Sequence, residues 1–400
     1  MIYFNNAADS YPKLAAINDF LSKPSFFIAG RDCNCQTNKE LKVVDNFREN
    51  LLEFTNATDN FLVTITSSAT EASNLVINSF NKCKSDNDYV IYDHSNHNSV
   101  LRPLHELYGE NHLKMHNNIF GSPDYFDKDC IERIIESENG LKPQFLVFSH
   151  QSNVTGSIIR NIDELITFVK DNDIPLILDI TQSIGNTQID IKSILKDSGY
   201  NKLYLFGTTH KNLCSISGTG FLIHPKENNL VPLMYGGTGT QSLDYKQPKD
   251  YPHYLECGTY NIQSLQSANI AMNEAKEFID INKQIKSSLV RYFIDKYNEI
   301  NTPELEKYVI LQPKFINEES GIINLLPSND DIGKLIANEL FKKFIIVRFG
   351  CHCSPKFKFK LNGHTYDQTI RISFNQFNTK SEIDMFIKEY DHIMFTIMVQ

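Results

Sequence analysis

Short apolar runs alternate with amphipathic stretches along much of the chain. Apolar runs occur at 61–65, 89–92, 145–148 and 175–179, and such runs are typical of strands buried on both faces. Apolar residues at helical spacing fill the intervals, for example at 158–172. Strands that alternate with helices predict an α/β fold, in which helices cover both faces of a mostly parallel sheet.

A further apolar run, at 202–206, leads through a small polar turn to Lys211. A lysine just beyond a buried strand can enter a cleft, where desolvation makes its amine nucleophilic and able to hold pyridoxal phosphate as a Schiff base. The run at 175–179 ends on Asp179, and a carboxylate there is what a pyridinium nitrogen needs to stay protonated. Most lysines are solvated surface residues, so this pair indicates such chemistry only together with other evidence.

Polar segments follow the predicted strands at 93–99, 149–156, 179–185 and 207–211. The carboxyl ends of parallel strands meet at one edge of a sheet, and ligands bind there in open α/β folds. We therefore expect these segments to converge on one ligand site.

The segment 66–71, Thr-Ser-Ser-Ala-Thr-Glu, joins the run at 61–65 to a helical stretch with Ala72, Leu75 and Val76 on one side. Its backbone N–H groups and hydroxyls, with the helix dipole behind them, would cradle an anion such as phosphate. The same residues would also serve as an ordinary helix cap. The segment by itself does not distinguish the two.

The character of the sequence changes after residue 242. Residues 243–261 are rich in Tyr and Pro, and a long helical pattern follows before a mixed α and β remainder. We predict a large domain at 16–250 and a smaller α+β domain formed by 1–15 and 251–400.

Composition and charge narrow the class of protein. The chain has 400 residues, 41% hydrophobic and 22% charged, as in globular proteins with room for two domains. The net charge of −9 comes without a basic stripe, which argues against a nucleic-acid partner. No apolar run approaches the roughly 20 residues that span a bilayer, and the first residues do not show the basic end and apolar stretch typical of a signal peptide. We expect a cytoplasmic protein with no membrane contact, whose eight cysteines are thiols.

Ordered motifs along nearly the whole chain carry a resemblance to a known family. They are 3–8 (YFNNAA), 66–72 (TSSATEA), 97–104 (HNSVLRPL), 149–156 (SHQSNVTG), 179–183 (DITQS), 208–211 (TTHK), 236–242 (GGTGTQS), 348–355 (RFGCHCSP) and 369–374 (TIRISF). This set resembles the class V aminotransferase family of type I pyridoxal-phosphate enzymes, most closely the cysteine desulfurases with a short catalytic-cysteine loop. The resemblance implies a large domain with a mostly parallel seven-stranded sheet flanked by helices, and a smaller α+β domain that carries the cysteine loop.

The resemblance also assigns a site for pyridoxal 5'-phosphate. Lys211 would bind the cofactor covalently and move the substrate proton, and Asp179 would pair with the pyridinium nitrogen. His97 would stack on the ring and assist the proton transfer. In a homodimer with shared active sites, Thr238 would reach the phosphate of the neighbouring subunit. The other implied cofactor contacts are Ala69, Thr70, Asn153, Gln182, Thr208 and His210.

The substrate site follows from the same resemblance. Arg371 would clamp the substrate carboxylate as a bidentate fork, with Arg348 beside it and Asn153 in contact with the substrate. Cys353 would attack the sulfur of L-cysteine, releasing L-alanine and holding the sulfur as a persulfide for an acceptor protein. A thiol near Arg348 and His352 suits this role because the thiolate is the nucleophile.

Other functions of the same fold stay open from the sequence. A selenocysteine lyase acting on L-selenocysteine, or a C–S lyase that releases sulfide, would depend less on Cys353. Transamination is a further activity of the superfamily. A non-catalytic relative would have no need of Lys211, Asp179, His97 and Arg371 together.

The cysteine pairs Cys33/Cys35 and Cys351/Cys353 raise the question of a metal site. Four thiolates could bind zinc, but the pairs lack the usual Cys-x-x-Cys spacing, and a metal on Cys353 would remove the nucleophile. We predict no metal site, and Cys351 is left as a second thiol able to resolve a persulfide. The phosphate turn departs from the family by carrying Ser68 where glycine is usual, which would tighten or shift the cradle.

Overall fold

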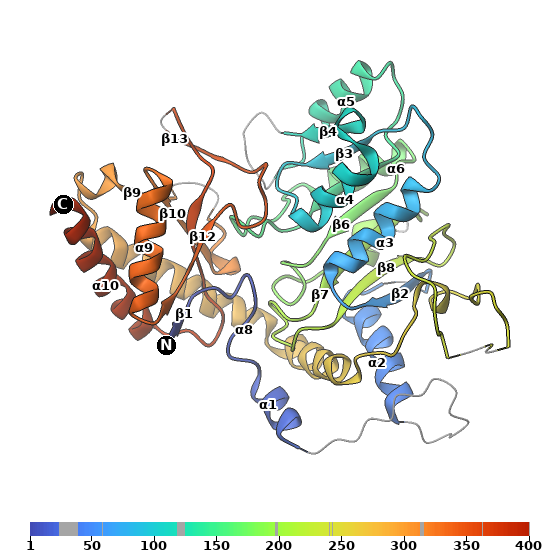
Figure 1. The fold of residues 1–400 in the computed structure, drawn as a ribbon, viewed down its shortest axis with the longest axis horizontal. Coiled ribbons are helices and arrows are strands. Elements are labelled where there is room, and N and C mark those ends of the chain that lie inside the picture. Colours follow the sequence, from blue (N-terminus) through green and yellow to red (C-terminus); the bar gives the residue numbers. More distant parts are fainter. Residues whose placement is uncertain are drawn as a thin grey trace.

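The computed structural model describes residues 1–23, 39–57, 59–117, 125–196, 199–239, 241, 243–312, 316–361 and 363–399. The described elements form two groups, each built around its own sheet, and one long helix runs from the first group to the second (Figure 1). None of the helices in these ranges is long and apolar enough to cross a membrane.

The first group contains a sheet of seven strands. Strand β8 is antiparallel to both of its neighbours, and all other neighbouring strands are parallel. Across the sheet the order is β2 (Phe61–Thr66), β8 (Gly220–Pro225), β7 (Leu203–Thr208), β6 (Leu176–Asp179), β5 (Phe145–Ser149), β3 (Val90–Asp93) and β4 (Leu113–His116). The predicted mostly parallel seven-stranded sheet is confirmed.

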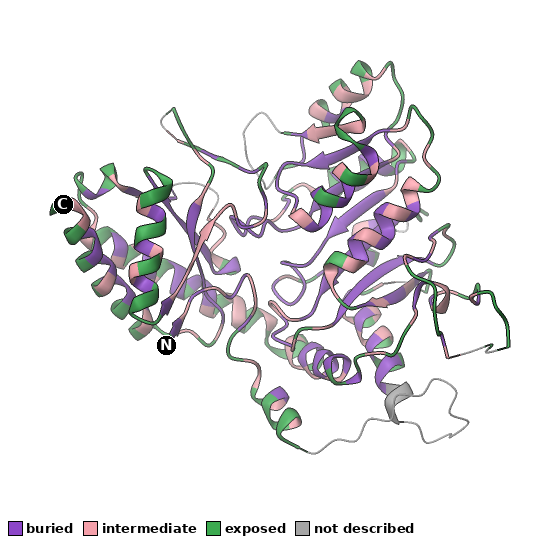
Figure 2. Ribbon diagram, in the orientation of Figure 1, coloured by how far each residue is buried: buried purple, intermediate pink, exposed green. Residues whose placement is uncertain are grey.

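Helices cover both faces of this sheet, and its inner strands β5, β6 and β7 are buried along their whole length (Figure 2). Along β5, Leu146 and Phe148 join one apolar cluster while Val147 joins the other, since successive side chains of a strand point to opposite faces. Helices α3 (Ala69–Asn81) and α4 (Asn98–Tyr108) pack on the face of Val147. The opposite face carries α1 (Ala15–Ser22), α2 (Lys39–Phe54), α5 (Lys128–Ser137), α6 (Ile162–Asp171), α7 (Ile191–Leu195) and the start of α8 (Ile262–Ile300).

The second group is an antiparallel sheet backed by helices. Its helices are α9 (Asp330–Lys342), α10 (Lys380–Val399) and the later part of α8. The N-terminal strand β1 (Ile2–Tyr3) pairs with β11 (Ile345–Ile346), which ties the start of the chain to this group. The sheet order is β12 (Arg348–Gly350), β15 (Thr369–Ser373), β10 (Ile322–Pro327) and β9 (Val309–Leu311), and a separate hairpin is formed by β13 (Phe359–Leu361) and β14 (His364–Tyr366).

Helix α8 belongs to both groups. Leu265 and Met272 near its start are buried in the core of the large sheet, whereas Val290 and Phe293 are buried in the core of the small sheet. The domain boundary at residue 250 stays a prediction, and we propose that the division falls inside α8 instead.

Candidate active site

A cavity of about 250 Å³ lies beyond the carboxyl ends of the large-sheet strands, on the side of the small sheet. Lys211 follows β7, Asp179 ends β6 and Ser149 ends β5, so the topology of the parallel strands brings these residues together. Eleven of the predicted site residues line the cavity: Ala69, Thr70, His97, Asn153, Asp179, Gln182, Thr208, His210, Lys211, Arg348 and Arg371.

Lys211 is the amine at the floor of this cavity. The pKa of Lys211 is lowered to about 8, mainly by burial and also by the positive charges of Arg371 and Arg348. The negative charge of Asp179 acts in the opposite direction and raises this pKa. Within the described part of the chain, the amine makes no hydrogen bond or ion pair. A larger fraction of this amine than of an ordinary lysine is therefore unprotonated near neutral pH, as a nucleophile requires.

Asp179 is the acidic group that faces Lys211. The residue is 7% exposed at the end of β6, and its carboxylate accepts a hydrogen bond from the backbone N–H of Thr181 at 2.9 Å. Burial raises the pKa of Asp179, although the contacts with Thr181 and the charge of Lys211 oppose this. A cationic ligand atom beside the carboxylate would favour its ionised form.

The turn before α3 forms one end of the cavity. Ser68 is the N-cap of α3, and its hydroxyl accepts a hydrogen bond from the N–H of Glu71 at 3.2 Å. A side chain at Gly220 of β8 would collide with the backbone of Ser68, so glycine is needed for this close approach. Ser68, Ala69 and Thr70 line the cavity at the positive end of the helix dipole, which is the arrangement of an anion site.

Three histidines near the cavity are uncharged at neutral pH. Burial and the charge of Lys211 lower the pKa of His97 to about 3 and that of His210 to about 4. His97 is the N-cap of α4, where its Nδ1 accepts the N–H of Ser99 at 3.0 Å. The pKa of His352 lies well below its ordinary value because of burial and the two arginines.

Arg348 and Arg371 occupy directly opposed positions on the antiparallel strands β12 and β15. Arg371 is 1% exposed, donates to the backbone oxygen of Asn153 at 2.7 Å, and leaves its Nε without a partner. Burial and the charge of Arg348 lower the pKa of Arg371 to about 9. No carboxylate of the described residues pairs with either guanidinium. Because like charges across a strand pair are destabilising, this pair is suited to an anionic ligand.

Cys353 lies at the edge of the cavity on a tight turn. The N–H of Ser354 donates to the carbonyl of Cys351 at 3.0 Å, and the central residues His352 and Cys353 have φ of 53° and 62°. Residues other than glycine rarely adopt this left-handed conformation, which carries a strain of about 1–2 kcal/mol each. An Arg348 N–H lies 3.0 Å from the Cys353 sulfur and would stabilise a thiolate there.

Hydrogen bonds from the large-sheet side hold this turn in place. The Asn153 side chain donates to the carbonyl of His352 at 2.6 Å and accepts from the Ser354 hydroxyl at 2.9 Å. The backbone N–H of Asn98 donates to the carbonyl of Cys353 at 2.7 Å. The proposed nucleophile is therefore fixed next to the cavity by groups that belong to the opposite group of elements.

The remaining predicted residues differ in their surroundings. Gln182 lines the cavity and donates to the backbone oxygen of Ala7 at 2.8 Å. Thr238 is buried in a separate segment, away from the cavity of the same chain. Cys33 and Cys35 lie outside the described residues. Seven further residues line the cavity that the sequence did not predict as part of its lining, although all of them lie within the polar segments and motifs noted above: Ala7, Ala8, Ser99, Ser149, Gln151, Thr181 and His352.

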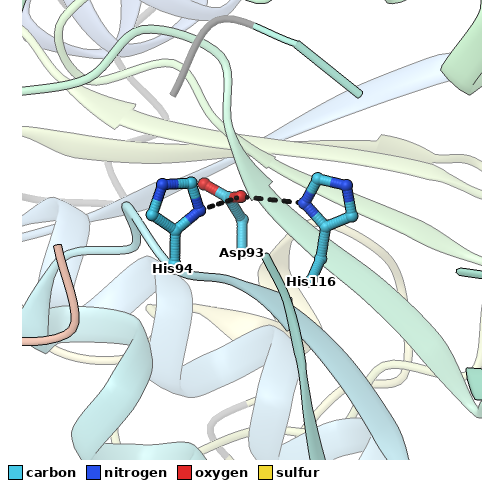
Figure 3. A group of neighbouring side chains, drawn as sticks. All are labelled: Asp93, His94 and His116. Carbon is cyan, nitrogen blue, oxygen red and sulfur yellow. Dashed lines mark hydrogen bonds and ion pairs between the residues drawn. The ribbon is translucent and has the colours of Figure 1, made fainter. Parts of the chain in front are cut away.

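A buried acid with two histidines lies at the ends of β3 and β4 (Figure 3). The carboxylate of Asp93 is 3.1 Å from Nδ1 of His94 and 3.1 Å from Nδ1 of His116. Burial alone raises the pKa of Asp93, but His94 and the hydrogen bonds of both imidazoles bring it below its ordinary range. The same segment continues to Asn96, which donates to Ser149 at 3.1 Å, and then to His97.

This donor set could in principle bind a divalent metal. However, Nε2 of His116 accepts the backbone N–H of Asp127 at 3.0 Å, so the His116 proton lies on Nδ1 and points at Asp93. A metal on Nδ1 would move the proton to Nε2, where it would face the backbone N–H of Asp127. The hydrogen bonds therefore favour a network that supports the His97 segment.

The fold is of the α/β class, and its cavity places the buried Lys211 near a helix N-terminus that is suited to an anion. Residues 4–386 match the family described as aminotransferase class-V. The chain belongs to this family, and the predicted resemblance is confirmed.

Within this family, the chain is similar to proteins and solved structures that are named as cysteine desulfurases. The chain is 26% identical over 402 residues to a protein of Pyrococcus abyssi named "Probable cysteine desulfurase", with 97% of this chain and 92% of that one covered. A protein of the same name from Ureaplasma parvum is 26% identical over 404 residues, with the same coverage of 97% and 92%. The apo structure of a cysteine desulfurase from Thermococcus onnurineus has a TM-score of 0.79 at 22% identity and covers 99% of this chain and 95% of that one. These structural similarities confirm the fold.

Proposed function

We propose that the protein is a pyridoxal-phosphate-dependent cysteine desulfurase, which converts L-cysteine to L-alanine and holds the sulfur on Cys353. The observation that carries this proposal is one cavity lined by Lys211, Asp179 and two arginines that make no ion pair with a carboxylate of the described residues. The Cys353 thiol lies at the edge of this cavity. Relatives named as cysteine desulfurases over almost the whole chain support it.

The residues of the cavity fit this cofactor. The Ser68–Thr70 turn offers N–H groups to a phosphate, Asp179 offers a carboxylate to a ring nitrogen, and Lys211 offers an amine to an aldehyde. Bound pyridoxal phosphate would supply an electron sink for the substrate carbon. The uncompensated Arg371, with its orphaned Nε, would receive the substrate carboxylate as a bidentate partner.

Each protein group has a protonation state that suits its role. Lys211, with a pKa of about 8, can take up a proton at Nζ and give it back near neutral pH. His97 stays neutral because its pKa is about 3, so its flat imidazole can stack on a ring without adding a charge. Arg348 donates an N–H to the Cys353 sulfur at 3.0 Å, which holds the thiol group beside the cavity.

The proposed sulfur transfer balances without an external oxidant. The Cys353 thiolate attacks the substrate sulfur, the carbon–sulfur bond of L-cysteine breaks, and a sulfur–sulfur bond forms. The carbon that loses sulfur is reduced and gains a proton to give L-alanine, while the sulfur pair is oxidised to a persulfide. The proposal further includes an acceptor protein that collects this sulfur.

We also propose a homodimer with shared active sites. Large apolar side chains next to Thr238 are open to solvent: Tyr235 is 67% exposed, while Leu243 and Tyr245 are fully exposed. A second copy of the chain would bury this segment and bring Thr238 to its phosphate site. Thr238→Ala should then weaken cofactor retention, and unchanged cofactor affinity would contradict a shared site.

The proposal is tested by incubating the purified holoprotein with L-cysteine and measuring L-alanine with and without a reducing thiol. Borohydride treatment should fix the cofactor to the peptide that carries Lys211, and mass spectrometry should find the persulfide on Cys353. Cofactor fixed elsewhere, or a persulfide confined to Cys351, would contradict the assigned roles.

The same assay with L-selenocysteine separates the selenocysteine lyase alternative. For a desulfurase, Cys353→Ala should abolish alanine formation from L-cysteine. A lyase specific for selenium would show little activity on L-cysteine in the wild-type protein as well, and its activity on L-selenocysteine would survive the substitution.

A further inference from the structure

A strip of exposed lysines follows the turn that carries Cys353. The segment 356–360 has the sequence Lys-Phe-Lys-Phe-Lys, with every lysine exposed and both phenylalanines buried. We name the three side chains Lys356, Lys358 and Lys360 the basic ridge. The segment leads into the β13–β14 hairpin, which stands beside the small sheet (Figure 1).

The aromatic side of this segment fixes the direction of the lysines. Phe357 stacks on His94 with ring centroids 5.6 Å apart and an interplanar angle of 23°. Phe359 packs against Phe357 and, with Val154, belongs to one buried cluster. Because successive side chains of an extended segment point to opposite sides, Lys358 and Lys360 point away from this cluster into solvent. Lys356 lies on the turn just before Phe357 and is exposed as well.

The charge on the exposed side is unbalanced. In the hairpin register Lys360 faces Thr365, and Lys358 forms an exposed ion pair with Asp367 at 3.1 Å. Neither Lys356 nor Lys360 makes an ion pair with any described residue. In a chain with a net charge of −9, three lysines against one acid form a local positive strip.

The basic ridge is close enough to Cys353 to influence what approaches the sulfur. Lys356 is three residues from Cys353, so their Cα atoms lie at most about 11 Å apart. The Debye length at physiological salt is about 8 Å. At low salt, where the Debye length grows to about 30 Å, a charged partner that reaches the Cys353 sulfur therefore experiences the field of Lys356.

We propose that the basic ridge docks an acidic face of the protein thiol that takes sulfur from Cys353. Charge complementarity at this distance would raise the encounter rate and orient the acceptor thiol toward the turn. An anionic membrane would also attract lysines, but the position next to the sulfur-carrying turn favours a thiol-bearing protein. This inference rests on the proposed function.

The experiment offers the holoprotein two synthetic peptides of equal length, each with a single cysteine, flanked in one by glutamates and in the other by lysines. Sulfur transfer from L-cysteine to each peptide is followed by mass spectrometry, with dithiothreitol as an uncharged reference thiol. At low salt we expect the acidic peptide to accept sulfur about 10-fold faster than the basic one, and the difference to fade toward about 1 M salt.

The ridge variant carries Lys356→Glu, Lys358→Glu and Lys360→Glu, and a milder variant carries glutamine at the same positions. We expect the ratio of the two peptide rates to fall about 10-fold in the glutamate variant and by less in the glutamine variant. The matched control makes the same charge change on exposed lysines elsewhere, including Lys334, which pairs with Asp331 much as Lys358 pairs with Asp367. Its substitutions are Lys170→Glu, Lys334→Glu and Lys388→Glu, and its ratio should stay that of the wild type.

The outcomes separate the two proposals. If the wild type forms no L-alanine even with dithiothreitol, the proposed function fails and this inference fails with it. Normal L-alanine formation with equal peptide rates, or an equal loss of preference in the control, overturns the inference alone. Ridge-dependent binding of the wild type to phosphatidylserine vesicles without any peptide preference would assign the basic ridge to membranes and also overturn it.

Discussion

The two sides of the cavity are positioned in different ways. On the large-sheet side, Lys211 and Asp179 follow or end neighbouring parallel strands, so the backbone topology alone brings them together. On the small-sheet side, Cys353 lies on a strained turn that side-chain hydrogen bonds from Asn153 and Ser354 hold. The comparison teaches that the first side should tolerate loss of single contacts, whereas the second depends on a few of them.

The two sides also differ in charge. Lys211 faces an acid, Asp179, whereas Arg348 and Arg371 face each other without one. On the large-sheet side, the charge of Asp179 thus offsets part of the charge of Lys211. On the small-sheet side, the two guanidinium charges would be offset by an anionic ligand. The predictions below test each half of this contrast.

The largest effect is expected for Lys211→Ala. The substitution removes both the amine for covalent binding and the proton carrier, so L-alanine formation should fall by at least about 10⁴-fold. Folding should be preserved, because the amine makes no hydrogen bond or ion pair with the described residues. Activity above this level, measured with L-cysteine and a reducing thiol, would contradict the role of Lys211.

Arg371→Gln tests the charge of the small-sheet side. Loss of a buried guanidinium that binds the substrate carboxylate should lower kcat/KM by about 10²- to 10³-fold, mainly through KM. The thermal stability should change little or rise, because an uncompensated buried charge is removed. A large loss of Tm with an unchanged KM would show that Arg371 serves the fold alone.

Asn153→Ala tests the hold on the Cys353 turn. Two hydrogen bonds to the turn are lost, each worth about 1 kcal/mol, so persulfide formation should slow by about 10- to 30-fold. The absorption of the bound cofactor should be nearly unchanged if Lys211 is positioned by the sheet. Equal losses in cofactor binding and persulfide formation would erase the distinction between the two sides.

The smallest effect is expected in the pH dependence of stability of the apoprotein. The pKa of Lys211 is about 8 when folded, against the ordinary 10.5, so the unfolded chain binds more protons between these values. Stability should therefore rise as the pH increases from about 8 to 10.5, by about 1 kcal/mol for a partly screened group. The free energies of unfolding of the wild type and of Lys211→Met, measured with denaturant, should diverge as the pH increases through this range. Parallel curves would mean that Lys211 titrates normally.

The large-sheet side could be predicted well from the sequence. The apolar runs at 61–65, 145–148, 175–179 and 202–206 all form strands of the large sheet, because residues buried on both faces must be apolar. Local patterns place Lys211 and Asp179 at strand ends, and the general rule for parallel sheets brings strand ends together.

The small-sheet side could not be predicted in the same detail. Even within the large sheet, strand β8 inserts between β2 and β7 through long-range antiparallel pairing, which no local pattern specifies. The opposition of Arg348 and Arg371 depends on register. The hold of Asn153 on residue 352 joins positions far apart in the chain. Only the resemblance pointed to these residues, and it assigned Asn153 to ligands rather than to the turn.

Helix α8 sets the spacing between the large-sheet side of the cavity, which carries Lys211, and the small-sheet side, which carries Cys353. Its 39 residues span about 58 Å at 1.5 Å per residue, and its opposite ends are embedded in different cores. Any shift of this helix along its axis would therefore change the distance between the Lys211 amine and the Cys353 sulfur. Inserting one alanine between Ala275 and Ile285 would rotate one end against the other by about 100° and uncouple both chemistries without touching a single reacting group.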